Sequence, residues 1–543
     1  MALFGPQFIF TIIMFILLTK LGKFYSYGRY LLCHKLYRYL SPNSVELKKS
    51  VRTHYKSQTK CKKMSRLFEI DDDKEEFNIP EGATIELSMS PVVAHDLHFI
   101  KYSDDFQSFV DVSQIAIIIY TSTEVYMAIF RPSDEINLSV VWCAMAILYG
   151  MTTLASIARN YLRTSEGALL FMFAGVSFIL SLLVQLADRK FFDFQLKDAF
   201  RNVSSNTLAL ISTSFQTQPP SPNAKVSKHT ETTTNQKIYS QLKYYSTNDL
   251  LFTCCIAFLS AFIGALFFFP AFRLARLHSL SLKYSQGSKS KRFLFYLSFI
   301  LPLLVSICWL KFETDAKVTN KTATTGANST INKFINLINL EKTNSHFFSS
   351  TKVFFLNVLF ATNLKIYLVV FFFLLRLALY RHYAQSYLNL AFEIAASIRK
   401  QSTKVTNTKY MSSISSIYQY YGVVANQYIV PLYVLLFMVF LLKTLGNYTW
   451  CGDIQCCNTV VDLLSSWSSN LRQNASNSPN LFKRLESTHF NISQSHHALN
   501  KIFTPYVLRS LIGYFTFWTS TIWFTISCIG LLYYHYIDSN YVV

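Results

Sequence analysis

The stretch Leu250–Arg292 reads LLFTCCIAFLSAFIGALFFFPAFRLARLHSLSLKYSQGSKSKR. Its first part, Leu250–Phe269, has no charged side chain and is about as long as a helix that crosses the hydrocarbon core of a bilayer. The part that follows, Ala271–Arg292, contains six Lys and Arg residues and no Asp or Glu. Basic residues directly after an apolar run are typical of a transmembrane helix that ends in the cytosol. This stretch therefore predicts a membrane protein.

The composition of the whole chain supports the same class. The 543 residues are 51% hydrophobic and 16% aromatic, and only 15% are charged. This apolar surface exceeds what a water-soluble core can bury, which argues against a soluble enzyme. The formal charge of +21 does not indicate nucleic-acid binding, because most basic residues flank apolar runs, where they set topology and contact lipid head groups.

Nine apolar runs are long enough to span a bilayer, so we predict an all-α fold, a polytopic membrane helix bundle of about nine transmembrane helices. The runs are Ala2–Thr19, Ser108–Phe130, Leu138–Ala158, Ala168–Leu186, Leu250–Phe269, Phe293–Leu310, Val353–Tyr380, Ile417–Leu442 and Tyr506–Tyr536. Residues 1–19 are expected to be an anchor rather than a cleaved signal peptide, because no basic residue precedes the run and no small-residue cleavage site follows it.

Basic residues after the first run, such as Lys20, Lys23 and Arg29, place that side of the membrane in the cytosol. Alternation of the remaining spans then gives the expected organisation. It consists of a cytosolic segment 20–107, spans within 108–187, a lumenal and largely disordered loop 188–249, spans within 250–310, a lumenal loop 311–352, spans within 353–442, a lumenal loop 443–505, a last span 506–536 and a cytosolic tail 537–543.

Glycosylation sequons offer a test of this topology that is independent of charge, because Asn-x-Ser/Thr is modified only on the lumenal side. All of them fall in expected lumenal segments, starting at Asn137, Asn202, Asn320, Asn328, Asn447, Asn474 and Asn491. A glycoprotein is therefore expected. The pattern does not distinguish the endoplasmic reticulum from the plasma membrane.

The extramembrane segments carry weaker signals. The segment Lys20–Gln107 is either a solvated tail or a basic surface that binds anionic lipid, with a short strand over Ala83–Ser90. The Ser/Thr-rich loop from Arg201 to Asn248 predicts disorder. The last lumenal loop lies in an oxidising compartment, which permits a disulfide from Cys451 to Cys456 or Cys457.

No motif indicates catalysis, and we expect neither an enzyme nor a metal or cofactor site. Three histidines share the last lumenal loop, but they lack metal-ligand spacing; they are His489, His496 and His497. Three others, His278, His382 and His535, are expected to lie at the cytosolic interface. Gly264 and Gly513 predict close contacts between helices, and Pro302 predicts a kink inside its span.

Ionisable residues inside spans are candidate functional sites, because each costs about 3 kcal/mol to insert. Four qualify: Asp111, Glu124, Lys365 and Arg376. From their depths in the expected spans, we predict an ion pair between Asp111 and Arg376 and a second between Glu124 and Lys365. Such pairs could fix helix register, which is the simpler interpretation, or they could form a proton or ion relay.

Several strings in this order resemble the transmembrane protein 161 family of animal multi-pass membrane proteins. The strings are YSYGRYLLC at Tyr25–Cys33, TEVY at Thr123–Tyr126, LSVVWC at Leu138–Cys143, FPAFRLARLH at Phe269–His278, LRLA at Leu375–Ala378, YLNLA at Tyr387–Ala391, LLKTLGN at Leu441–Asn447 and IFTP at Ile502–Pro505, followed by Arg509. They do not distinguish subtypes A and B. The lumenal tracts at 202–248 and 313–350 look longer than usual for the family, and the Cys451 cluster is not part of its pattern.

The resemblance implies a glycosylated, non-enzymatic membrane protein. It also implies regulation of membrane excitability through restraint of potassium and calcium currents, with links to cardiac rhythm, to cortical development and to protection from oxidative stress and apoptosis. Partners would be the lipid bilayer and ion-channel or other membrane-protein subunits, bound through helix faces such as the one bearing Gly264. The alternative is a transporter or ion channel whose four intramembrane charges line the path.

Overall fold

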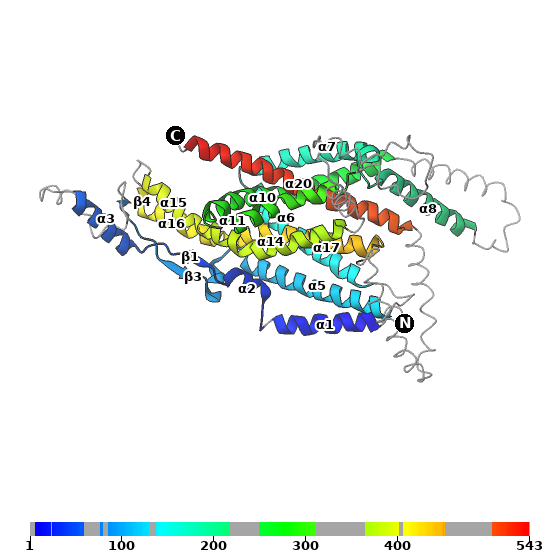
Figure 1. The fold of residues 1–543 in the computed structure, drawn as a ribbon, viewed down its shortest axis with the longest axis horizontal. Coiled ribbons are helices and arrows are strands. Elements are labelled where there is room, and N and C mark those ends of the chain that lie inside the picture. The colour runs from blue at the N-terminus through cyan, green and yellow to red at the C-terminus, as the bar shows by residue number, and fades with distance from the viewer. Residues whose placement is uncertain are drawn as a thin grey trace, which may run out of the picture.

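The structure, a computed structural model, describes residues 6–22, 24–58, 76–79, 85–130, 137–216, 249–310, 364–400, 405–448, 450 and 502–541. Long helices run side by side along one axis, and the two termini lie at opposite ends of the bundle (Figure 1). An odd number of crossings requires this arrangement. The expected orientation puts the end with α3 (Ser44–Gln58) in the cytosol.

Nine helices of the described residues correspond to the nine expected spans. They are α1 (Pro6–Gly22), α5 (Ser103–Phe130), α6 (Ser139–Leu162), α7 (Gly167–Phe191), α10 (Asp249–Tyr284), α11 (Lys289–Ile307), α14 (Leu364–Leu388), α17 (Tyr421–Leu445) and α20 (Pro505–Tyr541). Seven are long and apolar enough to cross a membrane. The other two, α5 and α14, are those that carry the four intramembrane charges. The chain is therefore an all-α, multi-pass membrane protein.

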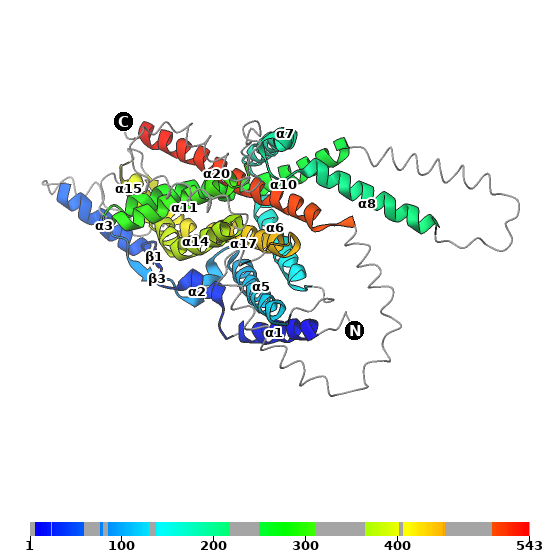
Figure 2. The same cartoon turned by 45° about the vertical axis from the view of Figure 1, so that its right-hand side comes forward.

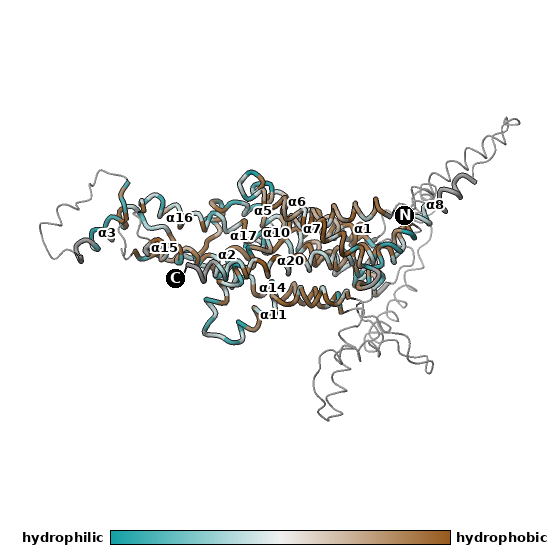
Figure 3. Tube along the Cα trace, turned by 90° about the horizontal axis from the view of Figure 1, so that it is seen from above, coloured by the Kyte–Doolittle hydropathy of each residue, from teal (hydrophilic) through white to brown (hydrophobic). Residues whose placement is uncertain are grey.

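Helix α17 occupies the centre of the bundle. It packs against α5, α6, α10, α14 and α20. Nearly every residue from Tyr421 to Leu442 is buried, which explains why this segment is apolar on all sides instead of amphipathic. Figure 3 shows hydrophobic residues along the bundle helices and more hydrophilic ones toward the end with α3.

Gly264 makes the close helix contact that the sequence predicts, and Gly513 packs closely against the ring of Trp309, which follows the end of α11. A Cβ at Gly264 of α10 would lie 2.5 Å from Ser177 Oγ of α7, and one at Gly513 of α20 would lie 2.5 Å from Trp309 Cη2. Both contacts lie inside the molecule. The helix face bearing Gly264 is therefore covered by α7, and the hypothesis that this face binds a partner is wrong.

The end of the bundle with α3 carries a second, smaller core. The shorter elements of the described chain are α2 (Tyr27–Cys33), β1 (Tyr37–Tyr39), α3, β2 (Asn78–Ile79), β3 (Met89–Pro91), η2 (Ala94–Phe99), α15 (Leu390–Lys400), β4 (Val405–Thr406) and α16 (Asn407–Gln419). The second core is built mainly by α3, β2, α15, β4 and α16, whereas α2 and η2 pack on the main core. Two antiparallel pairs join distant segments: Arg38 of β1 faces Ser90 of β3, and Ile79 of β2 faces Val405 of β4. Leu47, Ile79 and Ile414 are among the side chains that fill this core.

The segment Lys20–Gln107 is therefore not a solvated tail, at least in its described residues. The strand expected over Ala83–Ser90 is displaced, because β3 covers Met89–Pro91; residues 80–84 lie outside the described chain. Arg38 forms an ion pair with Asp96 at 2.9 Å and lies over the Tyr418 ring of α16 at 4.4 Å. These contacts fix the segment on the bundle.

The disorder expected from Arg201 onward is wrong for the first part of that segment, because Leu196–Gln216 form helix α8. Residues 217–248 lie outside the described chain. The first turn of α8 is capped by the buried Asp188, whose carboxylate accepts the backbone N–H of Leu196 at 2.7 Å and of Gln195 at 3.2 Å. Helix α8 packs against α20 and extends away from the end with α3 (Figures 1 and 2).

Candidate functional site

The middle of α14 places one arginine inside the bundle. Arg376 is 1% exposed, and its Nε and Nη2 donate to the Ser298 carbonyl oxygen of α11 at 3.4 and 3.2 Å. In a regular helix this carbonyl would accept the N–H of residue 302, four positions later. Residue 302 is proline and has no N–H. The kink residue predicted from the sequence therefore leaves a helix carbonyl open to the guanidinium.

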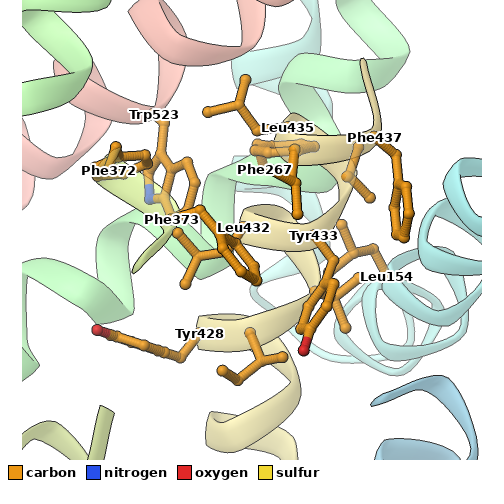
Figure 4. Close-up of a cluster of buried hydrophobic side chains, with 14 of the residues drawn as sticks. Leu154, Phe267, Phe372, Phe373, Tyr428, Leu432, Tyr433, Leu435, Phe437 and Trp523 are labelled. Atoms are coloured by element: carbon orange, nitrogen blue, oxygen red, sulfur yellow. The ribbon is translucent and has the colours of Figure 1, made fainter. Parts of the chain in front are cut away.

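Aromatic rings surround the same guanidinium. Its Cζ lies 5.0 Å from the Phe372 ring centroid, 5.3 Å from that of Trp523 on α20 and 5.8 Å from that of Tyr428 on α17. Figure 4 shows Trp523 beside Phe372 within the buried hydrophobic cluster. Ring faces attract a cation, and this attraction strengthens where water is excluded. Tyr428 also donates its hydroxyl to the Arg376 carbonyl oxygen at 2.9 Å.

A chain of polar side chains leads from this arginine to α10. The Ser298 hydroxyl lies 3.3 Å from the Tyr383 hydroxyl, which lies 3.3 Å from His278 Nδ1. His278 is 2% exposed, so its ring lies inside the bundle and not on its surface, whereas His382 and His535 are exposed. We call the residues Arg376, Ser298, Tyr383, His278, Tyr428, Phe372 and Trp523 the Arg376 cluster.

The cluster connects α10, α11, α14, α17 and α20 through one buried positive charge. No carboxylate of the described chain lies within 4.0 Å of this guanidinium, so its charge is held by a carbonyl oxygen and by rings alone. A fixed cation of this kind can hold helices together or attract an anion.

The predicted pair of Asp111 with Arg376 is wrong. The Asp111 carboxylate accepts the Ser26 hydroxyl at 2.6 Å and the Gly28 backbone N–H at 2.9 Å, which attaches α2 to α5. Two facts explain the error. Helix α14 begins at Leu364, so Arg376 lies at its midpoint and not near its cytosolic end. In addition, α17 packs against both α5 and α14.

The predicted pair of Glu124 with Lys365 is also wrong. Glu124 accepts a hydrogen bond from Lys443 at the end of α17. Lys365 instead donates to Asp193 at 3.3 Å and lies over the Trp309 ring at 4.0 Å. The sequence does not indicate Lys443 as a partner, because this residue directly follows the apolar run Ile417–Leu442. It does not indicate Asp193 either, because Asp193 lies in a segment expected to be a loop.

The described chain contains the asparagines of three of the seven sequons. Asn202 is exposed on α8, and Asn447 is exposed just after α17. The Asn137 side-chain oxygen accepts the Ser139 backbone N–H at 3.0 Å and the Ser139 hydroxyl at 2.6 Å at the start of α6. The other residues considered in the expected lumenal loops lie outside the described residues: Asn320, Asn328, Asn474, Asn491, Cys451, Cys456, Cys457, His489, His496 and His497.

Comparison with known proteins identifies a family for nearly the whole chain. The family model described as "Predicted transmembrane protein 161AB" matches residues 2–340 and 330–538. No solved structure matches this fold. The matched region contains all four intramembrane charges and every member of the Arg376 cluster.

Proposed function

The chain belongs to the transmembrane protein 161AB family, and from this premise we propose that it is a non-enzymatic membrane protein that regulates membrane excitability. In this proposal it restrains potassium and calcium currents by binding ion-channel or other membrane-protein subunits within the bilayer. The link to oxidative-stress protection that the family resemblance implies would follow from the same kind of binding.

One observation carries the proposal: the four intramembrane charges are held in four separate places. Asp111 binds α2, Glu124 binds Lys443, Lys365 binds Asp193, and Arg376 binds the Ser298 carbonyl. A relay for protons or ions needs neighbouring polar groups that hand the charge on from one to the next. Separately held charges are what a helix bundle uses to fix its register, which favours a binding role over a transport path.

The surface of the bundle provides room for such partners. Large apolar side chains of α7 and of the first half of α10 face outward; they include Phe171, Met172, Ile179, Leu186, Leu251 and Phe258. In a bilayer these side chains contact lipid or another membrane helix. Helix association in lipid depends on packing and not on the hydrophobic effect, so partner binding requires no charged surface.

A transporter or ion channel is the second candidate, and the polar chain from His278 through Tyr383 to Ser298 favours it. These groups lie next to one another between helices, as the steps of a proton path would. This series of polar groups ends at Arg376. An arginine side chain does not release its proton in proteins, so it cannot pass one on.

Flux through purified protein in liposomes separates the two candidates. Potassium, calcium and proton movement is measured for the wild type and for two paired variants, Glu124→Gln with Lys443→Met and Lys365→Met with Asp193→Asn. Both partners are replaced together, because removal of one would leave a buried charge unpaired. The proposal predicts no flux from the folded wild type. Flux that either paired variant abolishes would make the chain a transporter or channel.

The binding role is tested in cells that do not express the protein. Re-expression of the wild type should lower potassium and calcium current densities, and cross-linking in the native membrane should capture a channel subunit. Both paired variants should retain these effects, since they leave the outward-facing residues of α7 and α10 unchanged. Unchanged currents after re-expression at normal levels would contradict the proposal.

A further inference from the structure

Two buried hydrogen-bond donors of the Arg376 cluster lack an acceptor. Arg376 Nη1 and Trp523 Nε1 are both inaccessible to solvent, and neither makes a hydrogen bond to the described chain. Each residue is 1% exposed. Buried donors are nearly always paired, since an unpaired one loses its bonds to water and gains nothing in return.

The two donors belong to residues that are in contact. Arg376 Cζ lies 5.3 Å from the Trp523 ring centroid, and Phe372 touches both, at 5.0 Å from the guanidinium carbon and 5.7 Å from the indole ring. This contact lies between the midpoint of α14 and the middle of α20. An arginine remains charged even when it is buried, so the contact carries a full positive charge.

We propose that Arg376 and Trp523 bind a small monovalent anion of the halide class between α14 and α20. Such an anion accepts the N–H groups of Nη1 and Nε1 and neutralises the guanidinium. The proposal does not depend on the binding role proposed above, because an anion here can stabilise the bundle whatever its partners are.

The geometry favours a halide over a carboxylate or phosphate. Oxyanions bind arginine best through two parallel N–H bonds from its planar fork. Here Nε and one N–H of Nη2 already donate to the Ser298 carbonyl oxygen, so the fork that these two nitrogens form is occupied, and Nη1 is the guanidinium nitrogen without an acceptor. One guanidinium nitrogen and one indole N–H suit a single acceptor atom. The surrounding rings of Phe372 and Tyr428 offer no further charge to balance a divalent anion.

The test uses the full-length protein in lipid nanodiscs with sodium gluconate as the reference salt. Chloride or bromide replaces gluconate at constant ionic strength, and the apparent melting temperature and the tryptophan fluorescence are recorded. For the wild type, the melting temperature should rise with halide and saturate. Bromide should quench a saturable part of the fluorescence, and this part should be missing in Trp523→Phe.

Substitutions locate the site. Arg376→Gln should abolish the saturable halide effect. Trp523→Phe keeps a ring but removes the N–H, and it should raise the half-saturating chloride concentration roughly tenfold or more, the loss expected for one hydrogen bond to a charged group. Two control variants should leave halide binding unchanged. In Trp518→Phe the lost indole N–H already donates to the Ser260 carbonyl oxygen at 2.9 Å, and in Lys365→Met the lost cation is already paired with Asp193.

Two outcomes would overturn the proposal. One is a folded wild-type protein that shows no saturable response to chloride or bromide. The other is a saturable response whose half-saturating halide concentration is the same in Arg376→Gln and in Trp523→Phe as in the wild type. That result would place the ion elsewhere. If Arg376→Gln does not fold, the comparison of Trp523→Phe with Trp518→Phe decides alone, because both variants remove the same chemical group from α20.

Discussion

Lys443 at the end of α17 donates a hydrogen bond to Glu124 on α5, with only 13% and 14% of the two side chains exposed. The Lys443 ammonium also lies 5.7 Å from the Trp450 ring centroid. This ion pair ties the central helix to its neighbour at the end of the bundle opposite the Asp111 contact, so α5 is held at both ends by a carboxylate.

Removal of either partner of this pair should destabilise the bundle. Lys443→Met leaves the mostly buried Glu124 carboxylate unpaired, and we expect a loss of about 2 kcal/mol in the free energy of unfolding. Glu124→Gln should have a smaller effect, because its amide oxygen still accepts a hydrogen bond. The apparent melting temperature in detergent micelles measures both. In the double variant no charge is left unpaired, so its loss should be smaller than the sum of the two single losses; additive losses would show that the residues do not interact.

The pairing of Arg376 with the carbonyl freed by Pro302 can be tested by returning the missing N–H. In Pro302→Ala the helix itself donates to the Ser298 carbonyl oxygen, so that oxygen no longer depends on Arg376. Arg376→Met should therefore cost less stability in the Pro302→Ala background than in the wild type, with a coupling of about 1 kcal/mol. Thermal unfolding of the four proteins of this cycle gives the coupling, and a value of zero would mean that the freed carbonyl does not anchor the guanidinium.

The sequence predicts the class of fold because membrane helices are local: an uninterrupted apolar run such as Leu250–Phe269 identifies a span without knowledge of its neighbours. The small-residue contacts at Gly264 and Gly513 were predicted for the same reason, since only a tight contact gives a glycine in a lipid-spanning helix a role. These features require no information about which helices are adjacent.

The partners of the charged residues could not be predicted, because they depend on helix adjacency. The sequence places Asp111 and Arg376 at similar depths, but α17 packs against both of their helices. Asp111 instead binds the Gly28 N–H of α2, and Arg376 binds the Ser298 carbonyl of α11. One signal was available: a proline inside a span frees the carbonyl four residues earlier, which identifies Ser298 as an acceptor. The apolar spacing of Leu196, Ala199 and Val203 likewise indicates helix α8, although its Ser/Thr-rich composition suggested disorder.

The close contact of α10 with α7 predicts a steric effect at Gly264. Gly264→Ala should lower the apparent melting temperature, because its Cβ would lie 2.5 Å from Ser177 Oγ, and overpacking of this kind typically costs about 1–3 kcal/mol. Ser177→Gly in the same chain should recover part of the loss. The control is Gly175→Ala on α7, where no atom lies within 4 Å of the added Cβ, so stability should stay the same or rise slightly. An equal loss in both alanine variants would attribute the effect to something other than the α7 contact.

The cap of α8 should control whether this helix stays folded beside α20. Asp188→Ala removes the acceptor of the Gln195 and Leu196 N–H groups, and caps of this kind contribute about 1 kcal/mol. Because the loss is local, amide hydrogen exchange of residues 196–207 should become faster while the exchange of α17 stays the same. Asp188→Asn keeps an acceptor oxygen and should retain most of the protection.

The control for this prediction is Asp198→Ala. It changes an acidic residue of the same first turn that is 48% exposed, and it leaves both cap bonds in place, so it should change the exchange little. Equal acceleration in Asp188→Ala and Asp198→Ala would mean that the charge of the first turn, and not the Asp188 cap, holds α8.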